Sequence, residues 1–438
     1  MRIQGLRAFV LSSWFGLAPA LGALAGQGLA GCGQDGSASS AAPSRAEAEP
    51  SASPAEETPE ASLGADVRRE AIPGGIGSRV FVVERETESL AVYDLSSRSL
   101  LPQRIEGFGN MRHAIVAFSP DLRWGYVATR SGKLSRIDLQ TLERAGDVFT
   151  SENSIDIAIS QDGRFVATAE YAPGGVTILD AQSMEVVRRI PSERSRITGI
   201  VDAPGNRFVC VAMEGREVWI IDASDPEFPI ERRIPVPEAD PYDAMITPDG
   251  RYYVVGHLDS HRISVVDLRR PEAAVRVVSI AAPGSEADRE APVKLPHMAS
   301  WAVAGAHIFV PLVGQASLAV LDRDSFEMVR SIELRGHPVY SVASPIGHEI
   351  WVSFSGESDD AFVQIIDTSS FEVKDEIEVG ARIYHLDFTP RGAYVLVSAN
   401  RANTLALIDA TRREIVDRET LQSPSGVFGA WRAFRIGL

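Results

Sequence analysis

Cysteine is nearly absent from this chain, because its 438 residues include only Cys32 and Cys210. Two cysteines cannot form a disulfide framework, and with Cys32 lipidated, as expected below, no disulfide is available to Cys210. No Cys-x-x-Cys-His motif occurs, so we expect no covalent c-type haem. Cys210 stands in the strand-like run 208–211, where we expect it to be a small buried hydrophobe.

Net positive charge is also missing. The chain has 43 basic and 59 acidic residues, a net charge of −16, and removal of Arg2 and Arg7 with an export signal would make it −18. This charge argues against nucleic acid as a partner and against electrostatic adhesion to anionic lipid. Beyond residue 31 there is no apolar run long enough to cross a bilayer and no sustained helical period.

The N-terminus has the features of an export signal. Arg2 and Arg7 precede an apolar stretch over 8–30, and the run Leu-Ala-Gly-Cys at 29–32 resembles the lipobox of bacterial lipoproteins. The alternative is an ordinary secretory signal followed by a chance cysteine. Residues 1–31 are therefore predicted to be a signal peptide, and Cys32 to be the lipid attachment site of a periplasmic, membrane-anchored protein.

Residues 32–75 are rich in Ala, Ser, Pro and Glu. Such a segment cannot bury enough apolar surface to order itself. We predict a disordered tether here and a folded domain over 76–438.

Eight short apolar runs end in aspartate and are followed by a turn, at spacings of 44, 42, 42, 45, 55, 45 and 42 residues. Such a repeat with about four strands predicts an all-β fold, an eight-bladed β-propeller. The aspartates recur in every repeat, so we expect them to be structural. They are Asp94, Asp138, Asp180, Asp222, Asp267, Asp322, Asp367 and Asp409.

The first repeat lacks its innermost strand and opens at 79–83, whereas the last is followed by a strand-like run at 424–431. We therefore expect N- and C-terminal strands to close one blade together, which removes an open sheet edge. With strands A to D counted outward, the D-to-A and B-to-C loops share one face, here called the mouth face. The insertion around 283–295 lengthens one repeat. It could form a lid or a homodimer contact, and the sequence does not distinguish these two roles.

Six of the eight histidines map to the mouth face. His113 and His297 take nearly the same register in strands A of blades four apart, so they should face each other across the ring. Arg85, Arg130 and Tyr171 map to B-to-C loops of the same face. The other four histidines are His257, His261, His337 and His385.

Opposed imidazoles with a rim of guanidinium groups suit a flat iron ligand that carries carboxylates, such as a tetrapyrrole. Imidazole binds iron axially, and arginine pairs with carboxylates. His113 is the predicted ligand, His297 the predicted acid/base or distal donor, and Arg85 and Arg130 the predicted carboxylate binders. Asp202, an acid inside a strand A, is a further catalytic candidate, with turn capping as the alternative.

The stretches 110–115 (Asn-Met-Arg-His-Ala-Ile) and 124–138 resemble the haem d1-binding propeller of cytochrome cd1 nitrite reductase, and the resemblance extends over roughly 76–438. It implies that His113 is the proximal iron ligand and that Arg85, Arg130 and Tyr171 contact the macrocycle. His297 resembles one distal histidine, whereas the second distal position falls near Ser344 and is lost.

Within this family, 110–114 and 296–301 (Pro-His-Met-Ala-Ser-Trp) resemble the NirF type of haem d1 biosynthesis protein. That implies a protein that binds haem d1 or a late precursor and assists a last step, as an oxidoreductase or by handover. Other haem d1 maturation proteins and nitrite reductase are the implied partners. The family's cytochrome c domain has no counterpart here, so the reductase itself is not expected.

Two other classes stay open at this point. A scaffold propeller of the YVTN/WD-like kind would present a protein-binding face and bind no cofactor. A hydrolase or lactonase propeller would need a cluster of carboxylates or histidines around a metal, and the sequence offers no convincing set.

Overall fold

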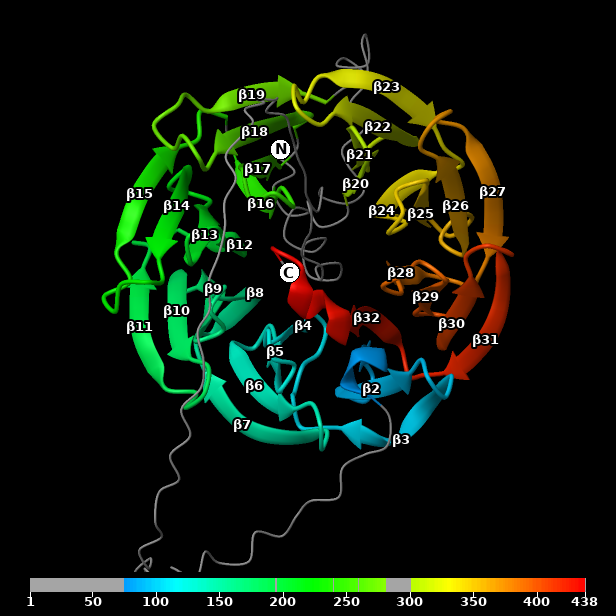
Figure 1. Cartoon of the computed structure of the whole chain (residues 1–438), viewed down its shortest axis with the longest axis horizontal. Coiled ribbons are helices and arrows are strands. Elements are labelled where there is room, and N and C mark those ends of the chain that lie inside the picture. Colours follow the sequence, from blue (N-terminus) through cyan, green and yellow to red (C-terminus); the bar gives the residue numbers. More distant parts are fainter. Residues whose placement is uncertain (1–74, 194, 239, 259, 281–300, 438) are drawn as a thin grey trace, which may run out of the picture.

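The fold is an all-β ring of eight four-stranded blades, which confirms the prediction from the repeat (Figure 1). The computed structural model describes residues 75–193, 195–238, 240–258, 260–280 and 301–437. Two short 3-10 helices in this part of the chain are η1 (Ile76–Ser78) and η3 (Ala430–Phe434). No helix in it is long and apolar enough to cross a membrane.

The strands of the first four blades follow in chain order, except that the last strand of the chain, β32, belongs to blade 1. Blade 1 consists of β1 (Arg79–Glu84), β2 (Ser89–Asp94), β3 (Ser99–Ile105) and β32 (Pro424–Gly429). Blade 2 consists of β4 (Ile115–Phe118), β5 (Trp124–Ala128), β6 (Lys133–Asp138) and β7 (Glu143–Phe149). Blade 3 consists of β8 (Asn153–Ile159), β9 (Phe165–Ala172), β10 (Gly175–Asp180) and β11 (Val186–Pro191). Blade 4 consists of β12 (Ile197–Ala203), β13 (Arg207–Ala212), β14 (Glu217–Asp222) and β15 (Ile230–Pro235).

The remaining blades repeat this order. Blade 5 consists of β16 (Pro241–Ile246), β17 (Tyr252–His257), β18 (Arg262–Asp267) and β19 (Arg276–Ser279). Blade 6 consists of β20 (Ala302–Ala304), β21 (His307–Leu312), β22 (Ser317–Asp322) and β23 (Met328–Glu333). Blade 7 consists of β24 (His337–Ala343), β25 (Glu349–Ser355), β26 (Phe362–Asp367) and β27 (Val373–Glu378). Blade 8 consists of β28 (Ile383–Phe388), β29 (Tyr394–Ala399), β30 (Thr404–Asp409) and β31 (Glu414–Thr420).

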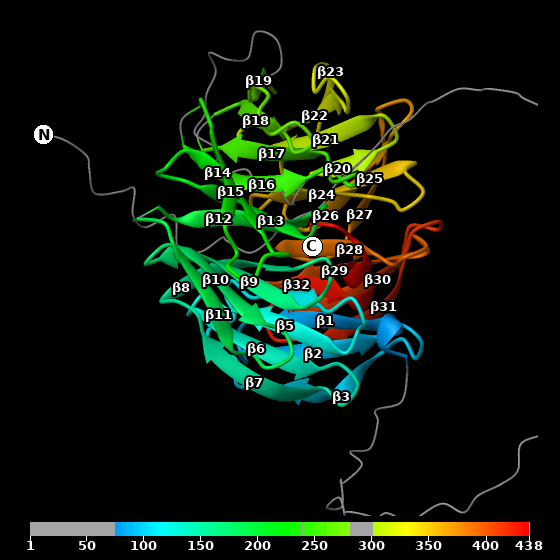
Figure 2. The same ribbon diagram turned by 60° about the vertical axis from the view of Figure 1, so that its left-hand side comes forward.

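The two ends of the chain close blade 1 together, as predicted. β32 supplies the innermost strand and pairs antiparallel with β1, with Val80 opposite Gly429 and Val82 opposite Val427. The blue strands β1, β2 and β3 lie beside blade 2 in both ribbon views, and red β32 completes their sheet (Figures 1 and 2). This pairing covers the inner edge of β1, which would otherwise be a site for aggregation.

The eight repeated aspartates are structural, as expected. Each one ends the third strand of its blade, and its carboxylate accepts a backbone N–H from the residue two further on. Asp138, for example, accepts from Gln140 at 2.8 Å and from Thr141 at 3.0 Å. The aspartate thus fixes the turn into the fourth strand, which explains its recurrence.

The core lies between the faces of neighbouring blades. The inner three strands of a blade are mostly buried, whereas β27 on the outer rim buries only Ile377. Trp219 and Trp351 are fully buried in these layers. Cys210 is also fully buried, as predicted, and burial raises the pKa of its thiol.

Candidate ligand-binding site on the mouth face

Four predicted site residues lie on the mouth face. Arg85 lies in the turn between β1 and β2, Arg130 in the turn between β5 and β6, and Tyr171 next to the end of β9. His113 lies in the turn that leads into β4. Because β4 and β5 are antiparallel, the loop before β4 and the loop after β5 reach the same end of blade 2. The roles of these residues stay predictions.

His113 is held in a short turn between blades 1 and 2. The side chain of Asn110 accepts the backbone N–H of Arg112 at 3.0 Å, and Ala114 donates its N–H to the carbonyl of Met111 at 3.3 Å. Asparagine favours such turns because its side chain can bond a backbone N–H two residues further on. The His113 side chain is 6% exposed, so the turn presents a buried imidazole.

Arg85 connects three blades beside this turn. Its Nη2 donates to the carbonyl of Arg112 at 2.9 Å and also to the hydroxyl of Tyr384, which lies on β28 of blade 8. The guanidinium carbon lies 4.0 Å from the centre of the Tyr384 ring, a cation–π contact. Arg85 therefore lies beside the residue that precedes His113, and a tyrosine fixes its orientation.

Arg382, just before β28, adds a guanidinium that the sequence reasoning missed. Burial lowers its pKa, and the positive charges of Arg85 and Arg401 lower it further. Its backbone N–H donates to Asp360 at 3.0 Å. Three arginines from blades 1 and 8 are thus within electrostatic range of one another.

Alignment of the repeats could have identified Arg382 from the sequence. It stands seven residues before Thr389, and Arg112 stands seven residues before Ser119. The two hydroxyl residues open equivalent A-to-B turns, so the two arginines occupy equivalent positions before strand A.

Tyr171 forms a second group on this face. The guanidinium carbons of Arg130 and Arg196 lie 6.0 Å and 5.3 Å from the centre of its ring. Its hydroxyl is hydrogen-bonded to that of Tyr242 on β16, and burial raises the pKa of Tyr171. Tyr171 of blade 3 therefore reaches past blade 4 to blade 5.

Asp202, the further catalytic candidate, does not lie with the predicted site residues of the mouth face. It lies near the end of β12 that leads into the A-to-B turn, on the opposite face, here called the far face. Its carboxylate accepts the backbone N–H of Gly437 at 2.7 Å and a weaker bond from Gln161 at 3.4 Å. Burial raises the pKa of Asp202 to about 6. The observed contacts are those of an anchor for the C-terminal segment.

Several predictions lie outside the described residues. These include His297 and its opposition to His113, the insertion around 283–295, and Cys32 with the signal and tether. Their roles stay predictions.

Two other mouth-side histidines serve the packing of blades. Nε2 of His385 is hydrogen-bonded to the Tyr340 hydroxyl at 2.9 Å, and its Nδ1 accepts the N–H of Val427 at 2.8 Å. His385 thereby joins blades 7, 8 and 1. His257 is also fully buried, and its Nε2 is hydrogen-bonded to Ser264 at 2.9 Å.

The far face is covered in part by the end of the chain. After η3, Arg435 approaches Asp387 of blade 8 at 3.9 Å, and Ile436 packs against the core of blades 4 and 5. The red end of the ribbon lies near the centre of the ring (Figure 1). The C-terminal segment thus runs from blade 1 past blade 8 to blade 4.

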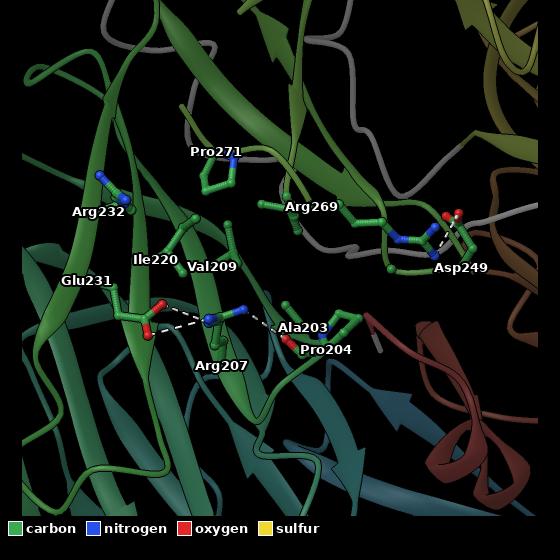
Figure 3. A pocket seen from close by; sticks show the side chains of 12 residues that line it. Ala203, Pro204, Arg207, Val209, Ile220, Glu231, Arg232, Asp249, Arg269 and Pro271 are labelled. Atoms are coloured by element: carbon green, nitrogen blue, oxygen red, sulfur yellow. Dashed lines mark hydrogen bonds and ion pairs between the residues drawn. The ribbon is translucent and has the colours of Figure 1, made fainter. Parts of the chain in front are cut away.

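A cavity of about 760 Å³ also opens on the far face, between blades 4 and 5 (Figure 3). Two of the three arginines that line it are paired: Arg207 with Glu231 at 2.7 Å, and Arg269 with Asp249 at 3.7 Å. These pairs neutralise the charge that an anionic ligand would need. Within the described ranges, no three His, Cys, Asp or Glu side chains are grouped so that they could hold a metal ion.

Comparison with known proteins establishes the family. The sequence profile of the cytochrome D1 heme domain matches residues 77–433. The chain belongs to this family. The family that the motifs around His113 predicted is thereby confirmed.

Characterised relatives agree with this assignment. The chain is 36% identical over 373 residues to Protein NirF of Stutzerimonas stutzeri and 37% identical over 372 residues to Protein NirF of Pseudomonas aeruginosa; each match covers 83% of this chain and 94% of the relative. It is 27% identical over 331 residues to the dihydro-heme d1 dehydrogenase of Pseudomonas aeruginosa, covering 72% of this chain and 64% of the relative.

Among solved structures, the dihydro-heme d1 dehydrogenase NirN in complex with DHE superimposes with a TM-score of 0.72. The match covers 85% of this chain and 78% of that chain at 23% sequence identity. At this identity the likeness supports the propeller fold.

Proposed function

We propose that this protein binds haem d1 or a late precursor on its mouth face and acts in the last steps of haem d1 biosynthesis. Membership of the cytochrome D1 heme domain family and the similarity to two NirF proteins support this proposal. The relative named a dihydro-heme d1 dehydrogenase favours a dihydro precursor as the form that is bound.

The proposal rests on unpaired guanidinium groups beside a buried imidazole. Among the described residues, neither Arg85 nor Arg130 forms an ion pair with a carboxylate, and Nε of Arg85 is buried without a hydrogen bond. Buried polar groups in native proteins nearly always have partners, so this atom indicates a missing ligand. A macrocycle that carries carboxylates would supply those partners.

The donor set fits such a ligand. His113 would hold the iron, and Arg85, Arg130 and Arg382 would pair with carboxylates. When bound, the tetrapyrrole supplies the redox-active centre, whereas the protein supplies orientation and charge neutralisation.

We further propose that the protein works in the periplasm, anchored by lipid on Cys32, because residues 29–32 match the lipobox. Membrane fractionation of the Cys32→Ser chain against the unchanged chain tests this. Recovery of both chains in the same fraction would contradict the anchor.

Titration of the purified full chain with haem d1 and with its dihydro precursor tests the binding function. We expect a shift in the visible spectrum that saturates at one ligand per chain, and an altered spectrum in His113→Ala if His113 holds the iron. His348→Ala is the matched control, since His348 is exposed in an A-to-B turn of the far face.

An unchanged spectrum in His113→Ala would remove the ligand assignment. No affinity of the unchanged chain for either tetrapyrrole would overturn the binding function and favour the scaffold propeller.

A further inference from the structure

Among the described residues, the two most exposed large apolar side chains lie on the far face. Ile346 is 70% exposed in the A-to-B turn of blade 7, and Phe434 is 69% exposed at the end of η3. Contact of large apolar side chains with water is unfavourable. Where several of them gather within a polar rim, they mark a surface that another apolar phase covers.

The elements that carry these two side chains adjoin one another. The A-to-B turns of blades 7 and 8 touch, because a Cβ on Gly392 would lie 3.0 Å from Cδ of Pro345. Blade 8 also meets the segment after η3, since Arg435 approaches Asp387 at 3.9 Å. The two apolar side chains therefore belong to one region of the far face.

Unpaired guanidinium groups accompany the apolar side chains. Arg391 is exposed in the A-to-B turn of blade 8 and Arg412 in its C-to-D turn, and neither forms an ion pair with a described residue. The next residue, Arg413, pairs with Glu349 of blade 7 at 2.9 Å, which brings the C-to-D turn of blade 8 to the turn that carries Ile346. Guanidinium groups beside apolar side chains suit the phosphates at the surface of an apolar layer.

The N-terminal end of the described chain lies on the same face. η1 lies beside η3, and Ile76 packs in one cluster with Ala430. β1 follows η1 directly, and its first residue, Arg79, is opposite Asp94, which precedes a C-to-D turn of the far face. The predicted tether over 32–75 therefore meets the propeller on the far face, next to η3.

We propose that the far face lies against a phospholipid bilayer. Ile346 and Phe434 insert among the headgroups, and Arg391 contacts a phosphate. The proposal rests on the lipid anchor at Cys32, which is part of the proposed function. An anchor in the same bilayer makes the second contact intramolecular, so that a small surface is sufficient. The mouth face then points away from the bilayer, where a water-soluble partner can reach the ligand.

Thiol labelling of the full lipidated chain on phosphatidylcholine vesicles tests this orientation. Zwitterionic lipid is chosen because anionic lipid would repel a chain of net charge −16. With Cys32 lipidated and Cys210 buried, an introduced cysteine is the only reactive thiol. We expect a water-soluble maleimide to label Ile346→Cys and Phe434→Cys about tenfold more slowly on vesicles than in the unanchored Cys32→Ser background.

Phe149→Cys is the matched control, because Phe149 is 66% exposed at the end of β7 on the mouth face. Its labelling rate should be the same with and without the anchor. Equal rates at all three positions on vesicles would overturn the orientation. Slow labelling of Ile346→Cys and Phe434→Cys without vesicles would show self-association through this surface and would overturn its assignment to the bilayer.

Failure of the anchor can be distinguished from failure of the surface. If the unchanged chain does not remain on membranes, the anchor is overturned, and sedimentation of the Cys32→Ser chain with phosphatidylcholine vesicles decides about the surface. We expect weak binding that falls about tenfold in Phe434→Ser, because an inserted aromatic side chain is lost. No binding, or equal binding of both chains, would overturn the surface. Neither experiment depends on haem d1.

Discussion

Arg85 and Arg130 on the mouth face differ from two arginines on the far face in their partners. On the mouth face, Arg85 and Arg130 contact a carbonyl, a hydroxyl and two aromatic rings, and no described carboxylate pairs with either. On the far face, Arg207 pairs with Glu231 and Arg435 approaches Asp387. Charge left unpaired in a fold of net charge −16 marks a surface for an anionic ligand, whereas paired charge serves the fold.

The acids differ in the same way. Asp202 on the far face anchors the end of the chain through Gly437. Asp156 on β8 of blade 3, toward the mouth, accepts the N–H of the next residue, and burial raises its pKa well above the usual range. An acid inside an innermost strand is therefore no indicator of function until its level in the strand is known.

Removal of residues 430–438 should have the largest effect. Trp431 and Arg432 are buried in this segment, and its loss would also remove the contacts of Asp202 with Gly437 and of Asp387 with Arg435. We expect the free energy of unfolding to fall by about 3–5 kcal/mol, measured by urea denaturation. Phe434→Ala is the control, because Phe434 is 69% exposed and its truncation should have little effect. An unchanged urea midpoint in the shortened chain would contradict the structural role of this segment.

Arg85→Ala should have the next largest effect, a weaker binding of the ligand. Loss of a charge-assisted bond to a ligand carboxylate should weaken the affinity for dihydro-haem d1 about 30-fold, or about 2 kcal/mol. Arg207→Ala on the far face should leave this affinity unaltered, because Arg207 is paired with Glu231. Equal losses in the two variants would remove the distinction between the faces.

Asp202 should give the smallest effect, visible as a pH dependence of stability. Its pKa is about 6 in the folded chain against the ordinary value of 3.8, so folding takes up a proton between these values. The free energy of unfolding should therefore decrease as pH rises from about 4 to about 6, by roughly 2 kcal/mol. In Asp202→Asn this decrease should be smaller, as measured by urea denaturation at each pH. The same slope in both chains would contradict the assignment.

Much of the site could be predicted, because its motifs are local. His113 lies next to strand A in a recognisable segment, and Arg85, Arg130 and Tyr171 follow strand ends whose register the repeat fixes. Arg382 could also have been predicted, by a comparison of equivalent positions before strand A in the different repeats. The burial of Asp156 could not be predicted, because it depends on how β8 packs against the neighbouring blades.

The sequence by itself determined the number of blades, the strand that closes the ring and the face on which each loop lies, because these follow from a repeat and from period-two alternation. Only the tertiary structure decided which charges are paired and which acid anchors the chain end. Those contacts join residues such as Asp202 and Gly437 that lie 235 positions apart, and pairing at that range depends on how the blades pack.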